Sequence, residues 1–119
     1  MTKAEEIKQK YPEIARMTMR DVVETNEFKA CFKEAYETAW KRIRAIETKL
    51  RIVSRHPIRI LKEQKVFEVE NFKKEYLAVI DKQSRRSSSQ RQVINSIGSI
   101  AYVKTVETLM KKHDEQKNS

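Results

Sequence analysis

The stretch NEFKACFKEAYETAWKRIRAIETKLRIV, residues 26–53, decides the fold. Apolar residues recur along it at spacings of three and four, in the order Phe28, Phe32, Ala35, Ala39, Ile43, Ile46, Leu50 and Val53. This period places them on one face of an α-helix. The pattern predicts one long amphipathic helix over about residues 26–55, on the order of 40 Å in length.

A helix of that length equals the diameter of a compact domain of this size. A chain of 119 residues has an expected radius of gyration of about 13 Å when it is compact. We therefore expect an elongated domain, or a second copy of the chain that covers part of the apolar stripe. A homo-oligomer is the expectation that follows.

The flanking segments also read as helices. Residues 1–25 predict two or three short helices, because Thr2 with Glu5 and Thr18 with Asp21 have the spacing of capping boxes. Two later helices are expected at about 71–83 and 89–112, whereas residues 58–69 fit either a helix or a small hairpin. Residues 82–91 predict a basic flexible loop, and residues 113–119 a frayed tail. The fold class is all-α, an elongated helical bundle in a single domain, 1–119.

Composition excludes several classes of protein. The only glycine is Gly98, so the glycine-rich loops of common nucleotide-binding enzymes are absent. Cys31 is the only cysteine and falls on the apolar stripe, which indicates a structural thiol in a reducing compartment. No apolar run is long enough for a membrane span and the N-terminus is charged. We expect a cytoplasmic protein, or a nuclear one in a eukaryote, that does not bind membranes.

The end of the long helix is strongly basic. Residues 41–65 contain nine Lys or Arg and two acids, in a chain whose net charge is +9. On a helical projection the cations occupy the arc opposite the apolar stripe. Such a surface binds polyanions by neutralising phosphates and releasing counterions. The alternative is an ordinary solvated helix face. The candidate contacts here are Lys41, Arg42, Arg44, Lys49, Arg51, Arg55, Arg59 and Lys62.

A second basic cluster lies in the expected loop. Lys82, Arg85, Arg86 and Arg91 stand among serines and glutamines, with no acid between them. Their side chains, the hydroxyl groups and the start of the next helix all donate hydrogen bonds to phosphate oxygens. The alternative is a flexible linker.

Aromatic residues give a weaker signal. Phe28, Phe32, Phe72 and Tyr76 fall on apolar stripes and are expected in the core. Trp40 projects to the border between the apolar and basic arcs, where it packs at the edge of the core or stacks on a base.

No catalytic or metal-binding pattern is present. His56 and His113 are 57 residues apart and lack partners at ligand spacing, so we expect no metal, no cofactor and no enzymatic activity. His56 before Pro57 marks a helix boundary.

Residues 3–40, two short helices followed by TMRDVVETNEFKACF, resemble small DNA-packaging or regulatory proteins in which a helix-turn-helix precedes an oligomerising helical region. The turn RMTM lacks the glycine common in such turns. The leading hypothesis is a non-enzymatic protein that binds nucleic acid, DNA or RNA, through phosphates and as an oligomer. The alternative is a structural or adaptor protein that binds another protein, including one of helix-turn-helix type.

Overall fold

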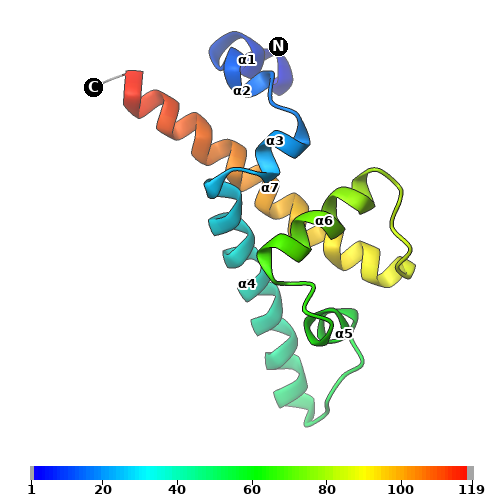
Figure 1. Cartoon of the computed structure of the whole chain (residues 1–119). Coiled ribbons are helices and arrows are strands. Elements are labelled where there is room, and N and C mark those ends of the chain that lie inside the picture. The colour runs from blue at the N-terminus through cyan, green and yellow to red at the C-terminus, as the bar shows by residue number, and fades with distance from the viewer. Residues whose placement is uncertain (1, 118–119) are drawn as a thin grey trace.

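The computed structural model describes residues 2–117, and within them every regular element is a helix. The helices are α1 (Lys3–Lys10), α2 (Pro12–Ala15), α3 (Met19–Val23), α4 (Asn26–Leu50), α5 (Pro57–Glu63), α6 (Val69–Ile80) and α7 (Ser88–Lys117). The two long helices, α4 and α7, pack against each other and carry the shorter ones (Figure 1). The molecule measures 51 × 31 × 28 Å, and its radius of gyration of 16.5 Å exceeds the compact value of about 13 Å. The predicted elongated all-α bundle is confirmed.

The N-terminal helices begin at the predicted capping residues. The Thr2 hydroxyl accepts a hydrogen bond from the Glu5 amide at 3.3 Å. Thr18 and Asp21 form a reciprocal capping box, with distances of 3.1 and 2.9 Å. These side chains satisfy amides that have no partner within the helix.

The long helix ends one turn earlier than predicted. α4 stops at Leu50, and Arg51 takes a left-handed conformation with φ of 54°. The predicted extension to residue 55 is wrong, because the chain turns back so that Ser54 donates its amide and hydroxyl hydrogens to the Glu47 carboxylate. Residues 51–55, which were expected to form the last turn of the helix, therefore form a loop.

The segment after Pro57 is helical, and the hairpin alternative for residues 58–69 is not formed. α5 is followed by a turn that contains Lys65 with φ of 61°, and the Asn71 side chain donates a hydrogen bond to the Lys65 carbonyl at 3.0 Å. α6 begins at Val69 and ends at Ile80, slightly before the predicted bounds of about 71–83.

α7 begins at Ser88, as expected, but extends beyond the predicted end near residue 112. The helix continues through Lys117, so the tail predicted to fray is helical where the structure describes it. Contacts with the N-terminal helices explain part of this extension. The Tyr11 hydroxyl donates to Asp114 Oδ2 at 2.7 Å, and the Tyr11 ring meets the His113 ring edge to face at 5.3 Å. Residues 118 and 119 lie outside the described range.

The centre of the core is an aromatic stack between α4 and α6, and α5 and α7 add buried aliphatic side chains to it. Phe32 and Phe72 have ring centroids 4.2 Å apart, and Tyr76 stacks on both Phe28 and Phe72 at about 6 Å. All four rings are at least 98 % buried. These residues therefore form the core, as their positions on the apolar stripes predict, and none of them is free to stack on a base.

Gly98 is the point at which α7 meets this stack. A Cβ atom added at Gly98 would lie 2.3 Å from the Tyr76 ring. Glycine is required here because the ring of α6 lies directly on the backbone of α7. The group that approaches Gly98 is thus an aromatic side chain rather than another backbone.

Candidate nucleic-acid interface

The basic stretch lies on the half of α4 that extends away from the core, together with the loop after it and α5 (Figure 1). Lys41, Arg42, Arg44, Lys49, Arg51, Arg55 and Lys62 are exposed. α5 packs beside this half of α4 and adds its own cations to those of the helix. The candidate residues of 41–62 are thus brought together on one projecting part of the molecule.

Glu47 is the exception within this basic part, because it is buried. Its carboxylate accepts hydrogen bonds from the Ser54 amide at 2.9 Å, the Ser54 hydroxyl at 2.8 Å and the Arg59 Nε at 3.1 Å. A second Arg59 nitrogen bonds the other carboxylate oxygen, which makes the ion pair bidentate. Arg59, helped by Ser54, lowers the pKa of Glu47 to about 2. We call this arrangement the Glu47 clamp.

The Glu47 clamp changes the charge that the surface presents. Glu47 is the only acid among residues 41–62, and Arg59 neutralises it. Of the eight Lys and Arg in that range, only Arg59 forms an ion pair with another residue of the described chain, 2–117. Within residues 41–62 the surface therefore presents seven cations without a free carboxylate. Glu63, the last residue of α5, is exposed and adds one negative charge beside Lys62, so the field outside the surface stays positive.

A shallow depression of about 440 Å³ lies over the Glu47 clamp. It is lined by Arg44, Glu47, Thr48, Arg51, Ile52, Val53 and Arg59. Arg44 lies in α4, and Arg51 follows two turns later at the C-terminal end of the helix. Guanidinium groups of this kind can donate two parallel hydrogen bonds to an oxyanion.

Trp40 packs under two of the cations. Lys62 Nζ lies 4.3 Å and the Arg59 guanidinium carbon 5.2 Å from the centroid of the indole ring. Both distances are within the range of cation–π interactions. The ring holds α5 against α4 and is half-buried, which supports the edge-packing interpretation of Trp40 over that of a base-stacking platform.

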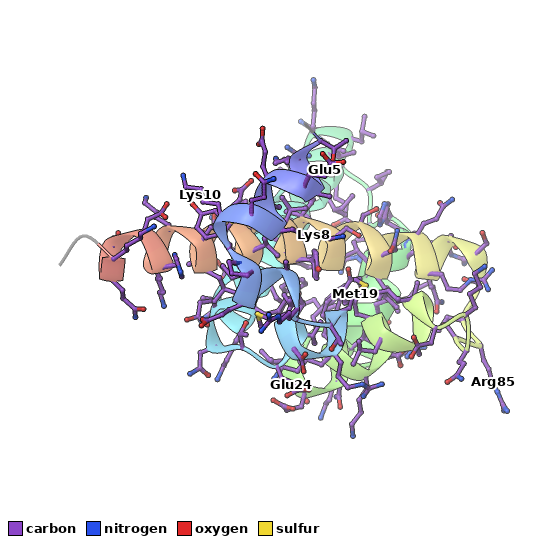
Figure 2. All side chains as sticks on the ribbon, turned by 90° about the horizontal axis from the view of Figure 1, so that it is seen from above. Glu5, Lys8, Lys10, Met19, Glu24 and Arg85 are labelled. Atoms are coloured by element: carbon purple, nitrogen blue, oxygen red, sulfur yellow. The ribbon has the colours of Figure 1, made fainter. Side chains whose placement is uncertain are left out.

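The second basic cluster divides into anchored and free side chains. Arg86 is anchored, because it forms a bidentate ion pair with Glu75 at 2.8 and 2.9 Å and also donates to Gln64 at 2.7 Å. Arg85 points away from the body of the protein at the edge of the loop (Figure 2). Arg86 therefore fixes the loop that carries its neighbour, and the loop is more structured than a flexible linker.

Lys82 and Arg91 lie on a common depression at the start of α7. Its volume is about 410 Å³, and its lining also includes Ser84, Ser88, Gln92 and Asn95. Lys82 has a left-handed conformation with φ of 58°, which turns the chain at the end of α6. This depression combines cations, hydroxyl groups and the positive end of a helix dipole, as phosphate-binding surfaces do.

The burial and pairing of Glu47, and the anchoring roles of Arg59 and Arg86, were not predicted from the sequence. A signal for the Glu47 clamp was present, because Glu47 is the solitary acid within a run of cations. A carboxylate that lies alone among Lys and Arg is well placed to pair with one of them. No such signal marked Glu75, which lies 11 residues before Arg86.

The two histidines have structural positions. His56 accepts a hydrogen bond from the Ile58 amide at 3.1 Å and so caps α5, as its place before Pro57 indicates. His113 packs on Tyr11. Within residues 2–117 there is no group of three or more His, Cys, Asp or Glu side chains arranged to hold a metal ion.

Comparisons with protein-family models, curated proteins and solved structures find no match to this chain. None of the helices in residues 2–117 combines the length and apolar character needed to cross a membrane.

α2 and α3 have four and five residues, about one turn each, so neither has the length of a helix that lies in the major groove of DNA. Function must therefore be argued from the surface of the molecule.

Proposed function

We propose that this protein is a non-enzymatic nucleic-acid-binding protein that contacts phosphates through the outer half of α4, the following loop and α5. The observation that supports this proposal is the Glu47 clamp, which neutralises the only acid of residues 41–62 and leaves seven exposed cations there, with Glu63 at the end of α5 as a single exposed acid beside them. Phosphate contacts of this kind give affinity without reading base sequence. The proposed contacts are Lys41, Arg42, Arg44, Lys49, Arg51, Arg55 and Lys62, with Lys82, Arg85 and Arg91 as a second set.

Arg59 and Arg86 are left out of the proposed contacts because their guanidinium groups are engaged with Glu47 and Glu75. In this proposal both act indirectly, one by neutralising a nearby carboxylate and the other by positioning a loop. Arg59 keeps Glu47 from repelling a phosphate, and Arg86 holds the loop of the second set.

The test is fluorescence anisotropy with labelled duplex and single-stranded oligonucleotides of random sequence, titrated at several salt concentrations. Four or more phosphate contacts with a duplex give a slope of about −3.6 or steeper in a plot of log K against log salt. Micromolar affinity near physiological salt is expected. Binding no stronger than that of a generic cationic peptide would contradict the proposal.

A matched pair of triple variants locates the surface. The first variant removes three proposed contacts, through Arg44→Gln, Arg51→Gln and Arg55→Gln. The negative slope of log K against log salt should become shallower by about 2.7. Lys8→Gln, Lys29→Gln and Lys33→Gln remove the same charge from exposed positions elsewhere and should change the slope by less than about 1. Equal effects of the two variants would show that net charge, rather than this surface, governs binding.

Homo-oligomer formation stays a prediction, and sedimentation of the free chain tests it. Binding as proposed does not require it, because the cationic surface is complete on one copy. The alternative function, a module that binds another protein, has one observation in its favour. Large apolar side chains of α4 and α7 are exposed, among them Ile46, Leu50 and Ile100.

A further inference from the structure

A groove of about 720 Å³ lies between α4 and α7, with the first residues of α5 as its third side. Its apolar surface is formed by Ala39, Ile43, Ile58, Val93, Ile97 and Ile100. The α4 residues of the lining are small at the turns nearest the core, where Ala35 and Ala39 replace the larger residues found further along. Small side chains between two diverging helices leave room for the side chains of a third element.

The apolar surface continues beyond the groove along α4. Ile46 and Leu50 follow Ile43 on the same stripe and are 53 % and 58 % exposed. From Ala35 to Leu50 the stripe spans 15 residues, which is about 22 Å or four turns of helix. A long, straight apolar track beside a groove between helices has the shape that accepts the apolar face of another helix.

The charges around the groove favour an acidic occupant. Among the described residues, 2–117, no Asp or Glu lines it, whereas Arg42 of α4 and Lys104 of α7 are part of the lining. Lys49 lies two turns after Arg42 on the same side of α4 and extends the positive border along the exposed stripe. Lys104 pairs with Glu34 at 3.3 Å, so the positive border depends mainly on Arg42 and Lys49. Because this pair is exposed and contributes little stability, Lys104 can exchange Glu34 for a carboxylate of an occupant at small cost.

The same charges disfavour a second copy of this chain. Each copy has a net charge of +9, and a copy seated along this stripe would bring its own Arg42 and Lys49 to a border that is already positive. Like charges at an interface reduce affinity. An occupant with carboxylates beside its apolar stripe meets no such repulsion.

We propose that the groove binds an amphipathic helix of a protein partner. The partner helix has apolar residues at i, i+3, i+4 and i+7 over about four turns, and Asp or Glu residues that face Arg42 and Lys104. This interaction does not depend on nucleic-acid binding, although Arg42 and Lys49 belong to both surfaces, so the two ligands would compete for these side chains.

The test is a display selection with a library of random 16-residue peptides built on a helical scaffold, against the full chain. Two variants are compared with the wild type. Ile100→Ser removes an apolar side chain from the groove, and Val103→Ser removes one of similar exposure, 53 % against 50 %, from the same helix. Val103 lines a different depression beneath α1, so it is the matched control.

The expected result is enrichment of peptides with the apolar spacing and acidic flanks. Their affinity should fall about tenfold with Ile100→Ser and less than twofold with Val103→Ser. Lys104→Gln should relax the selection for acids, whereas Lys112→Gln should not, although both lysines pair with a glutamate of α4.

Several results would overturn the proposal. No enrichment, or enrichment of peptides with basic flanks, contradicts the assigned chemistry. A dimer in sedimentation that Ile100→Ser dissociates would make the groove an interface between copies. If Ile100→Ser weakened oligonucleotide and peptide binding equally, the groove would belong to the nucleic-acid surface. Failure of oligonucleotide binding alone would leave the peptide result unaffected, so the two proposals fail separately.

Discussion

The inner half of α4, which lies in the core, and the outer half, which carries the basic stretch, have the same apolar period. They differ in how far their apolar side chains are buried. Phe28, Phe32 and Ala35 of the inner half are at most 5 % exposed, whereas Ile46 and Leu50 of the outer half are more than half exposed. α6 and α7 cover the inner stripe. The outer half is covered on only one side, where α5 packs against Trp40 and Glu47.

This difference shows what an apolar stripe does and does not specify. The stripe fixes which side of a helix is apolar, because the period is a property of the helix itself. Whether that side is buried depends on the length and path of other elements. In this molecule the inner half lies in the core, and the outer half exposes cations on one side and aliphatic residues on another.

The largest expected effect is a difference in stability between the two halves. Phe32→Ala should lower the free energy of unfolding by about 3–5 kcal/mol, because it removes a stacked ring from the core. Leu50→Ala should change it by less than about 0.5 kcal/mol, because the side chain is mostly exposed. Urea denaturation followed by circular dichroism measures both. Similar losses for the two variants would mean that the outer stripe is covered in solution.

The second expected effect concerns the way α7 packs on the inner core. Gly98→Ala should destabilise the protein by about 1–3 kcal/mol, because the added methyl group clashes with the Tyr76 ring. Ser96→Ala, two residues away and exposed, should be neutral or slightly stabilising, since alanine has the higher helix propensity. Thermal unfolding compares the two. A stabilising Gly98→Ala would contradict the close contact between α6 and α7.

Two arginines of the outer region should separate stability from binding. Arg59→Gln should destabilise the protein, because it leaves the buried Glu47 carboxylate without its partner. Arg55→Gln should leave stability unchanged and weaken oligonucleotide binding by two- to threefold, because Arg55 is exposed. Denaturation and anisotropy on both variants provide the check. Loss of stability with Arg55→Gln and loss of binding alone with Arg59→Gln would contradict these assignments.

The last comparison concerns the dependence of stability on acid pH. The pKa of Glu47 is about 2 in the folded protein, against an ordinary value of 4.5. A carboxylate with a lowered pKa stabilises the fold above about pH 4.5, and this contribution is lost as the pH falls towards 2. Glu47→Gln should lack this component, so the difference in stability between wild type and variant should shrink across that range. A difference that stays constant with pH would show that the Glu47 clamp is not formed.

The parts of this fold that depend on local sequence were predictable. Thr18 and Asp21 mark a helix start by their own chemistry, and the position of Phe32 on the stripe indicates its burial. The end of α4 was not predictable from the apolar period, which continues to Val53. It is set by hydrogen bonds from Ser54 and Arg59 to Glu47, across a turn of the chain.

The candidate surface was predictable in its composition but not in its detail. The concentration of cations in residues 41–65 is visible in the sequence. Which of them are free depends on ion pairs between elements, such as that of Arg86 with Glu75. The groove between α4 and α7 depends on how far the helices diverge, and this follows from packing that the sequence period does not describe.

The most direct test of the central claim is a map of backbone amide shifts by NMR during titration with a short random duplex. Our account predicts that the shifts concentrate in residues 41–62 and 82–91, in the outer half of α4, α5 and the basic loop. The first half of α4 and the N-terminal helices should change little. Shifts centred on residues 3–35, or spread evenly over the molecule, would contradict the assignment of binding to the outer half.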